Sequence, residues 1–180
     1  MDNQNSVILR PSESALIVID VQRGLFSKPN PVFNADLLLS KINTLKERFT
    51  TSGAPVFFIQ HSNKKMLVEG SENWQLHPEL DISENDIIIQ KTHGNAFEGT
   101  NLKVELDAIG IRNIVITGLV TNGCVKATSI GGKELGYRVI LVEDGHSSYI
   151  KGAAKLIRDW NRKLSKEFVD LYPTSAILLG

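Results

Sequence analysis

Five apolar residues lead into a carboxylate near the start of the chain, in the stretch Ala15-Leu16-Ile17-Val18-Ile19-Asp20. A strand with one face in water alternates apolar and polar residues, whereas a strand covered on both faces is apolar throughout. Five further apolar runs follow at Pro55–Ile59, Ile87–Ile89, Ile114–Thr117, Val139–Val142 and Ala176–Leu179. These runs predict the strands of a parallel sheet that is buried on both faces.

Segments with helical periodicity separate the runs, at Asp36–Phe49, Leu102–Ile109 and Ala153–Leu164. Alternating strands and helices predict an α/β fold in three layers, with helices on both faces of the sheet. The 180 residues contain no linker or internal repeat, so we expect one domain over residues 1–180. The aperiodic segment His61–Glu84 is long for a compact domain, which indicates a functional loop or a lid.

Composition limits the ligand and the compartment. Twenty basic residues balance twenty acidic ones, so we expect no nucleic acid and no membrane partner, but a small molecule. The sequence shows no secretory signal and no apolar stretch of the roughly 20 residues that span a bilayer, which predicts a cytoplasmic protein. The single cysteine, Cys124, excludes an internal disulfide and a multi-thiolate zinc site.

Three chemically distinct side chains close three of the predicted strands: Asp20, Lys91 and Cys124. Each residue can also have a purely structural role: Asp20 as a carboxylate that bonds to nearby amides, Lys91 as a solvated lysine, and Cys124 as a packed thiol. An alternative role for Asp20 is magnesium binding, but such sites use two or more carboxylates and the sequence has no Asp-x-Asp pair here. Because the carboxyl ends of parallel strands meet at one edge, we expect the three side chains to converge there.

Cys124 follows a strand and a short turn, and a helix is expected to begin beside it. The positive end of a helix dipole lowers the pKa of a nearby thiol. The same arrangement leaves backbone N–H groups free to bind an oxyanion, as in the nucleophile elbow of serine hydrolases. The position therefore indicates a reactive thiol.

Four residues beside these segments are expected to bind substrate: Gln22, Phe26, Trp74 and His93. An aromatic side chain in such a loop is either a pocket wall or a clamp for the loop itself. A Cys–His dyad that uses His93 is a competing mechanism, since histidine is the commonest general base. His146 is expected to be a loop residue that bonds to the backbone.

Ordered motifs from Ala15 to Trp160 resemble the isochorismatase-like cysteine hydrolases, which include nicotinamidases, carbamoylsarcosine amidohydrolases and streptothricin hydrolase. The motifs are Ala15–Gln22, Trp74–Leu80, Lys91–Phe97 with Gly99–Leu102, Thr117-Gly118 through Cys124-Val125, and Gly136–Val139 leading to Val142–Asp144. The resemblance implies a catalytic triad of Asp20, Lys91 and Cys124 and a six-stranded parallel sheet in the order 3-2-1-4-5-6. It also implies a cis peptide bond between Leu119 and Val120, and an oxyanion hole formed by the N–H groups of Val120 and Cys124.

The sequence departs from the family pattern in two places. Asn95 stands where the family often has serine, which puts the role of a hydroxyl there in doubt. The Asp-x-His cluster that binds metal in nicotinamidases is replaced by Gln60-His61-Ser62-Asn63. His61 and His77 are two ligands at most, and a catalytic zinc normally uses three, so we expect neither a metal nor another cofactor.

These observations predict a metal-independent cysteine hydrolase that cleaves a small C–N amide or imide through a thioester. One alternative is an enol-ether hydrolase of the isochorismatase type, which requires no thiol. Another is a binding or redox-sensing relative that has lost turnover. We also expect a homo-oligomer, in which a neighbouring subunit can contribute to the pocket.

Overall fold

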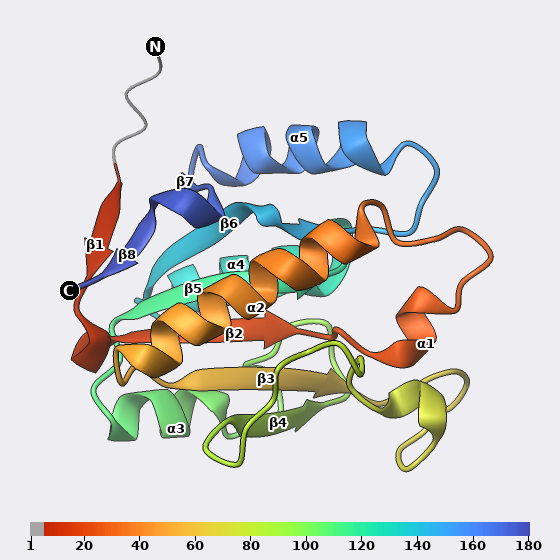
Figure 1. The fold of residues 1–180 in the computed structure, drawn as a ribbon, viewed down its shortest axis with the longest axis horizontal. Coiled ribbons are helices and arrows are strands. Elements are labelled where there is room, and N and C mark those ends of the chain that lie inside the picture. Colours follow the sequence, from red (N-terminus) through yellow and green to blue (C-terminus); the bar gives the residue numbers. More distant parts are fainter. Residues whose placement is uncertain (1–5) are drawn as a thin grey trace.

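The computed structural model describes residues 6–180, so residues 1–5 of the predicted domain lie outside the described residues. Its main sheet is parallel and has the strand order β4-β3-β2-β5-β6-β7 (Figure 1). Counted along the chain, this is the predicted order 3-2-1-4-5-6, which is confirmed. The strands are β2 (Ser14–Ile19), β3 (Val56–His61), β4 (Ile87–Lys91), β5 (Asn113–Leu119), β6 (Arg138–Ser147) and β7 (Asp170–Tyr172).

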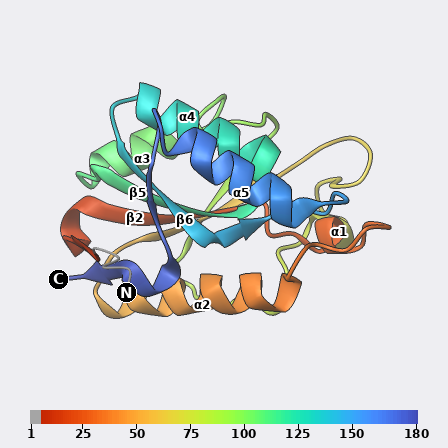
Figure 2. The same ribbon diagram turned by 90° about the horizontal axis from the view of Figure 1, so that it is seen from above.

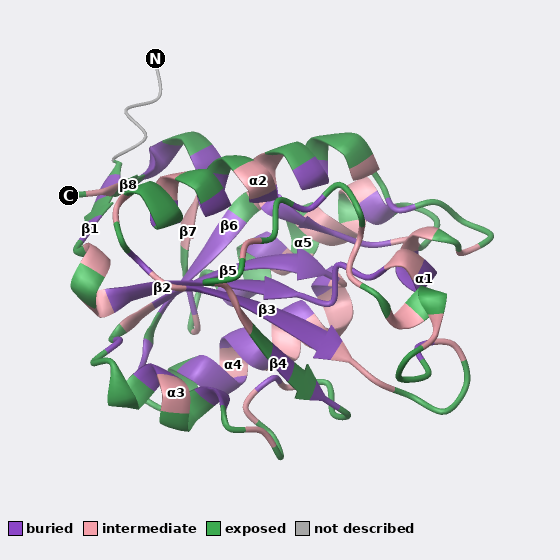
Figure 3. Ribbon diagram, turned by 60° about the horizontal axis from the view of Figure 1, so that its bottom comes forward, coloured by how far each residue is buried: buried purple, intermediate pink, exposed green. Residues whose placement is uncertain are grey.

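Helices cover both faces of the sheet. The long α2 (Ala35–Thr51) lies on one face, and α3 (Leu102–Ala108), α4 (Lys126–Glu134) and α5 (Ala153–Leu164) lie on the other (Figure 2). Along β2, Leu16 and Val18 join the core under α2, whereas Ala15, Ile17 and Ile19 join the core on the opposite face. Both sets are buried, which is why the strand is apolar throughout (Figure 3).

The last apolar run, Ala176–Leu179, was wrongly expected to be a strand of the main sheet. Its residues Ile177–Leu179 form β8, which pairs with β1 (Val7–Leu9) in a separate two-stranded parallel sheet. The sixth strand of the main sheet is β7 instead. It is a short edge strand whose residues are only half-buried or exposed, so it lacks the apolar run that marks the central strands.

The carboxyl ends of the strands face α1 (Arg23–Phe26) and the long loop between β3 and β4 (Figure 1). As expected, the loop has little regular structure, with a single turn of 3₁₀ helix at Glu72–Trp74. An antiparallel bridge between Gln22 and Leu76 ties it to the end of β2. Within residues 6–180, no helix is long and apolar enough to cross a bilayer.

Candidate active site

Asp20 lies directly after β2, where the backbone turns sharply. Its φ of 51° lies in the left-handed region, which aspartate tolerates better than most residues. Its N–H still donates to the carbonyl of Ile59 on β3, at 2.9 Å. The turn therefore fixes a carboxylate that is only 2% exposed at the end of the sheet.

Lys91 ends β4 and is the register partner of His61 at the end of β3. Its buried ammonium lies 2.9 Å from Asp20 Oδ2, 3.0 Å from His61 Nδ1, 3.1 Å from the carbonyl oxygen of His93 and 3.3 Å from Cys124 Sγ. Because an ammonium only donates, His61 Nδ1 must accept, so the proton of the neutral imidazole is on Nε2. Lys91 thus joins the ends of three strands to the thiol.

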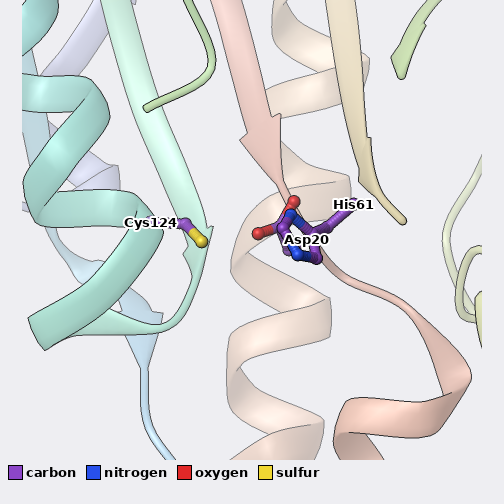
Figure 4. A group of neighbouring side chains, drawn as sticks. All are labelled: Asp20, His61 and Cys124. Carbon is purple, nitrogen blue, oxygen red and sulfur yellow. The ribbon is translucent and has the colours of Figure 1, made fainter. Parts of the chain in front are cut away.

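Cys124 lies in a kinked turn, Thr121–Val125, between β5 and α4. The Leu119–Val120 peptide bond that precedes the turn is cis, as the resemblance implies. The close approach of β5 to β2 requires Gly118, since a Cβ there would lie 2.2 Å from the carbonyl oxygen of Ile19. This approach brings the turn and its thiol next to Asp20, and Figure 4 shows Cys124 pointing toward Asp20 and His61.

The electrostatics describe a neutral thiol beside an ion pair. Burial, followed by the charge of Asp20, raises the pKa of Cys124 to about 12, although Lys91 opposes the shift. The expectation of a lowered pKa for this thiol is therefore wrong, because desolvation and the adjacent carboxylate together raise it more than Lys91 lowers it. Burial also raises the pKa of Asp20, and Lys91 counteracts that effect.

The carboxylate keeps one oxygen free for chemistry. Asp20 Oδ2 accepts from Lys91, whereas Oδ1 is buried and has no hydrogen-bond partner among the residues described. A buried carboxylate oxygen without a hydrogen-bond donor destabilises the charged form of the group. Such an oxygen therefore takes up a nearby proton more readily than a solvated one does. The arrangement can thus move a proton between the thiol and the carboxylate.

The same atoms also resemble a metal site. One ligand atom each of Asp20, His61 and Cys124 lie within 4.8 Å of one another, a donor set compatible with zinc. The ammonium of Lys91, however, contacts all three residues and already supplies the positive charge between them. His77, the other ligand candidate of the sequence, packs its ring against Phe26 instead, with centroids 4.3 Å apart. The residues present do not fit a metal while Lys91 is charged.

His146 lies in strand β6 and bonds to side chains, so its expected place in a loop with backbone contacts is wrong. Its Nε2 lies 2.7 Å from Asn161 Oδ1, and its Nδ1 lies 2.9 Å from Thr121 Oγ1. The Asn161 amide donates its Nδ2 to the carbonyl of Glu143, so its oxygen accepts from His146 Nε2 and leaves Nδ1 to accept from Thr121. Burial lowers the pKa of His146 to about 4. This neutral histidine holds the first residue of the cysteine turn.

Gln22, expected to bind substrate, is fully buried and bonds to the backbone. Its Nε2 donates to the carbonyls of His61 and Trp74, and its Oε1 accepts from the N–H of His61. All of these partners are protein groups, so the side chain ties the long loop to the end of β3. The sequence signal for Gln22 was its position in the aspartate motif, which does not distinguish a clamp from a ligand contact.

The other three residues expected to bind substrate do not line the cavity at Cys124 either. Trp74 donates Nε1 to Ser62 Oγ at 2.8 Å and packs against the core, which makes it a clamp for the loop. Phe26 packs against His77, with the two rings tilted by 47°. His93 contributes its backbone carbonyl to Lys91, whereas its ring is 52% exposed and faces Glu98, which does not support a Cys–His dyad. The side chain of Asn95 lies against Gly131 of α4.

A cavity of about 530 Å³ opens above the thiol. Asp20, His61, Val120 and Cys124 form part of its lining, and the rest comes from residues that were not predicted individually: Leu25, Lys28, Asn63, Lys64, Lys65, Met66, Leu67 and Tyr149. Five of these, Asn63–Leu67, lie in the segment His61–Glu84, which the sequence indicated as a functional loop. The sequence identified His61 only as a possible metal ligand in the run Gln60-His61-Ser62-Asn63, and not as a partner of Lys91. For the others, only their presence in loops near strand ends pointed to the site.

Comparison with known proteins agrees with this geometry. The sequence model of the isochorismatase domain matches residues 14–156, which includes Asp20, Lys91 and Cys124. The chain belongs to the isochorismatase family.

Relatives within the isochorismatase family cover most of the chain. A streptothricin hydrolase of Streptomyces noursei is 33% identical over 81% of this chain and 53% of its own length, so the chain spans about half of that relative. The uncharacterized isochorismatase family protein YecD of Escherichia coli O157:H7 is 32% identical over 78% of this chain and 82% of its own. A crystal structure of an isochorismatase family protein superposes with a TM-score of 0.84 at 31% identity, covering 88% of this chain and 96% of the other. This membership supports a hydrolase.

Proposed function

We propose that this protein is a metal-independent cysteine hydrolase that cleaves a small C–N amide or imide through a thioester. The observation that carries the proposal is the convergence at Lys91, whose Nζ lies 2.9 Å from Asp20 Oδ2 and 3.3 Å from Cys124 Sγ. A thiol, a carboxylate with a free oxygen and a fixed positive charge are the parts that nucleophilic acyl transfer needs. The cavity at the thiol has the volume of a small-molecule site.

In the first half of the reaction, Cys124 Sγ attacks the carbonyl carbon as its proton moves to Asp20. The carbonyl electron pair moves to oxygen, where the N–H groups of Val120 and Cys124 stabilise the oxyanion. Asp20 then gives the proton to the leaving nitrogen, the C–N bond breaks, and a thioester remains. Because burial holds the thiol neutral at rest, thiolate character develops only as the carboxylate takes the proton.

In the second half, water attacks the thioester carbonyl as Asp20 accepts a proton from that water. The C–S bond breaks, and Asp20 returns the proton to sulfur, which regenerates the thiol and releases a carboxylic acid. Lys91 keeps its charge throughout and compensates the buried carboxylate. His61 presents its Nε2–H at the cavity, where it can donate to substrate or to the attacking water.

Two other functions remain alternatives. An enol-ether hydrolase of the isochorismatase type would use Asp20 for proton transfer and would not need Cys124. A binding or redox-sensing protein would need neither turnover nor a thioester. The contact between the thiol and Lys91 favours the amide reaction over the enol-ether reaction, which uses no thiol.

A panel of small amides, assayed for ammonia release with the wild type and the C124A and C124S variants, tests the proposal. We expect both variants to lose at least about 10³-fold in kcat/KM, because the covalent route is gone. Rapid quenching of the wild type should reveal an acyl adduct on Cys124 by intact mass. Unfolding temperatures within a few degrees of the wild type control for folding. Residual activity within about tenfold would contradict covalent catalysis by Cys124. A wild type that hydrolyses no amide would favour the enol-ether reaction.

A further inference from the structure

Three lysines from two separate segments line the outer part of the active-site cavity. Lys28 follows α1, and Lys64 and Lys65 lie in the loop after β3. Lys64 and Lys65 are exposed and Lys28 is partly exposed, whereas Asp20 at the inner end is buried. The cavity therefore leads from a positively charged mouth to the thiol.

The charge at the mouth is local and uncompensated. The chain as a whole has a formal net charge of zero, with 20 basic and 20 acidic residues. Across residues 6–180, none of the three lysines has a carboxylate within the 4.0 Å of an ion pair. The acidic residue in the cavity lining, Asp20, is already paired with Lys91. A cavity with such an excess of one sign concentrates ligands of the opposite sign.

The loop that carries two of the lysines is held in shape before any ligand binds. Asn63 Oδ1 accepts from the N–H groups of Lys65, Met66 and Leu67, at 2.8 to 3.1 Å. The N–H of Asn63 donates to the carbonyl of Leu67 at 2.9 Å, and the Leu67 side chain is 2% exposed. The turn is thus closed by four hydrogen bonds and anchored by a buried leucine.

Lys28 is oriented by a second lining residue. Its Nζ lies 5.2 Å from the centroid of the Tyr149 ring, within the range of a cation–π contact. Leu25, Met66 and Leu67 supply an apolar wall to the same cavity. The lining therefore offers a thiol at the inner end, an apolar wall and cationic groups at the mouth.

We propose that Lys28, Lys64 and Lys65 form an anion-binding subsite for a carboxylate carried by the amide substrate. This inference rests on the proposed hydrolase function and specifies its substrate class. The substrate is a small amide with its carbonyl at Cys124, a short apolar stem against Leu25 and Met66, and a carboxylate at the lysines. A neutral amide of the same size lacks the group that the lysines recognise.

Alkylation of Cys124 tests the subsite without requiring turnover. Iodoacetate carries a carboxylate and iodoacetamide is its neutral counterpart, and Cys124 is the single cysteine of the chain. The rate ratio of the two reagents is measured by intact mass and divided by the same ratio for N-acetylcysteine. The variant K28M/K64M/K65M removes the subsite. The variant K133M/K155M/K166M removes three exposed lysines that do not line the cavity.

We expect the normalised ratio of the wild type to exceed one and to fall about tenfold in K28M/K64M/K65M at low ionic strength. It should be unchanged in K133M/K155M/K166M. At about 1 M sodium chloride, where the screening length is about 3 Å, the wild type should approach the subsite variant. Equal ratios in the wild type and the subsite variant, or equal losses in both triple variants, would overturn the inference.

The result separates this inference from the hydrolase proposal. If the normalised alkylation ratio falls in K28M/K64M/K65M but no amide is hydrolysed, the anion-binding subsite is supported and the hydrolase proposal is contradicted. If neutral amides are hydrolysed but the alkylation ratio does not change in K28M/K64M/K65M, the hydrolase proposal is supported and the subsite is contradicted. If amide hydrolysis is found, carboxylate-bearing amides should lose kcat/KM in K28M/K64M/K65M chiefly through a higher KM, because the lysines bind a group remote from the reacting carbonyl.

Discussion

His61 Nδ1 lies 3.0 Å from Lys91 Nζ, and the two residues are register partners at the ends of neighbouring strands. Burial, with the charge of Lys91, lowers the pKa of His61, so the imidazole is a neutral acceptor. Three ammonium protons are thereby shared among four acceptors, and the longest contact is the one to sulfur. Asp20, His61 and the His93 carbonyl hold the ammonium in place, so its charge stays next to the thiol.

Replacing Asp20 and replacing Lys91 should move the reactivity of Cys124 in opposite directions. The charge of Asp20 raises the pKa of Cys124 and that of Lys91 lowers it. At pH 8, D20N should therefore be alkylated by iodoacetamide several-fold faster than the wild type, and K91M more slowly. Amide turnover should fall in both, in D20N by about 10²–10⁴-fold because the proton acceptor is lost. Alkylation rates that change in the same direction in both variants would show that the two charges do not control the thiol.

The buried pair should also give K91M a pH-dependent loss of stability. Leaving Asp20 without its partner should cost about 3–5 kcal/mol of unfolding free energy. The pKa of Asp20 is already raised above 3.8 by burial, so the folded state binds the proton more tightly and loses stability as the pH rises above that value. Without Lys91 the pKa of Asp20 rises further. The loss of unfolding free energy in K91M, relative to the wild type, should therefore be small near pH 4 and grow toward pH 7. Urea unfolding across this range measures it.

The double variant D20N/K91M is the matched control for that experiment. Because neither position then carries a charge, the double variant should be more stable at pH 7 than K91M alone, and its free energy of unfolding should lack the pH dependence that Asp20 contributes in K91M. Additive losses at every pH would mean that Asp20 and Lys91 do not compensate each other in the folded state.

His146 should make the wild type acid-sensitive in a separate range. Its pKa falls from 6.5 to about 4 on burial, so the unfolded state binds more protons between these values. The contribution of neutral His146 to the free energy of unfolding should therefore be complete above pH 6.5. It should decline by about 3 kcal/mol in all as the pH falls toward 4. H146Q should lose this slope whatever its stability at pH 7. A slope in H146Q equal to that of the wild type would assign the acid sensitivity to other groups.

Features of the fold and the site could be predicted where they depend on residues that are neighbours in the sequence. The central strands could be predicted because burial on both faces leaves a continuous apolar run, and Asp20 and Lys91 stood out because each ends such a run. Residues whose roles come from distant partners could not be predicted. Gln22 bonds to His61 and Trp74, 39 and 52 positions away, and nothing in its neighbourhood indicates those bonds.

The substrate cavity shows the same limit. Lys64 and Lys65 are an ordinary pair in a polar loop, and they become a feature of the site only because the turn at Asn63 places them in the lining of the cavity that Lys28 also lines. Similarly, the short β8 reads as one more strand of the sheet until its pairing with β1 is known. The pKa of Cys124 was mispredicted for a related reason, since the helix start was visible in the sequence and the depth of burial was not.

Activity should survive exhaustive chelation, because Lys91 supplies the positive charge among the three groups that otherwise resemble a metal site. Its ammonium contacts Asp20, His61 and Cys124 at 2.9 to 3.3 Å, so a divalent ion between them would face a like charge at close range. Elemental analysis of the purified wild type should give well below one zinc, iron or manganese per chain. K91M removes the competing charge and leaves a donor set that zinc can use, so it should bind zinc more tightly than the wild type. Stoichiometric metal in the wild type, or turnover lost on chelation and restored by zinc, would require Lys91 to be displaced or neutral and would return the protein to a nicotinamidase-like mechanism.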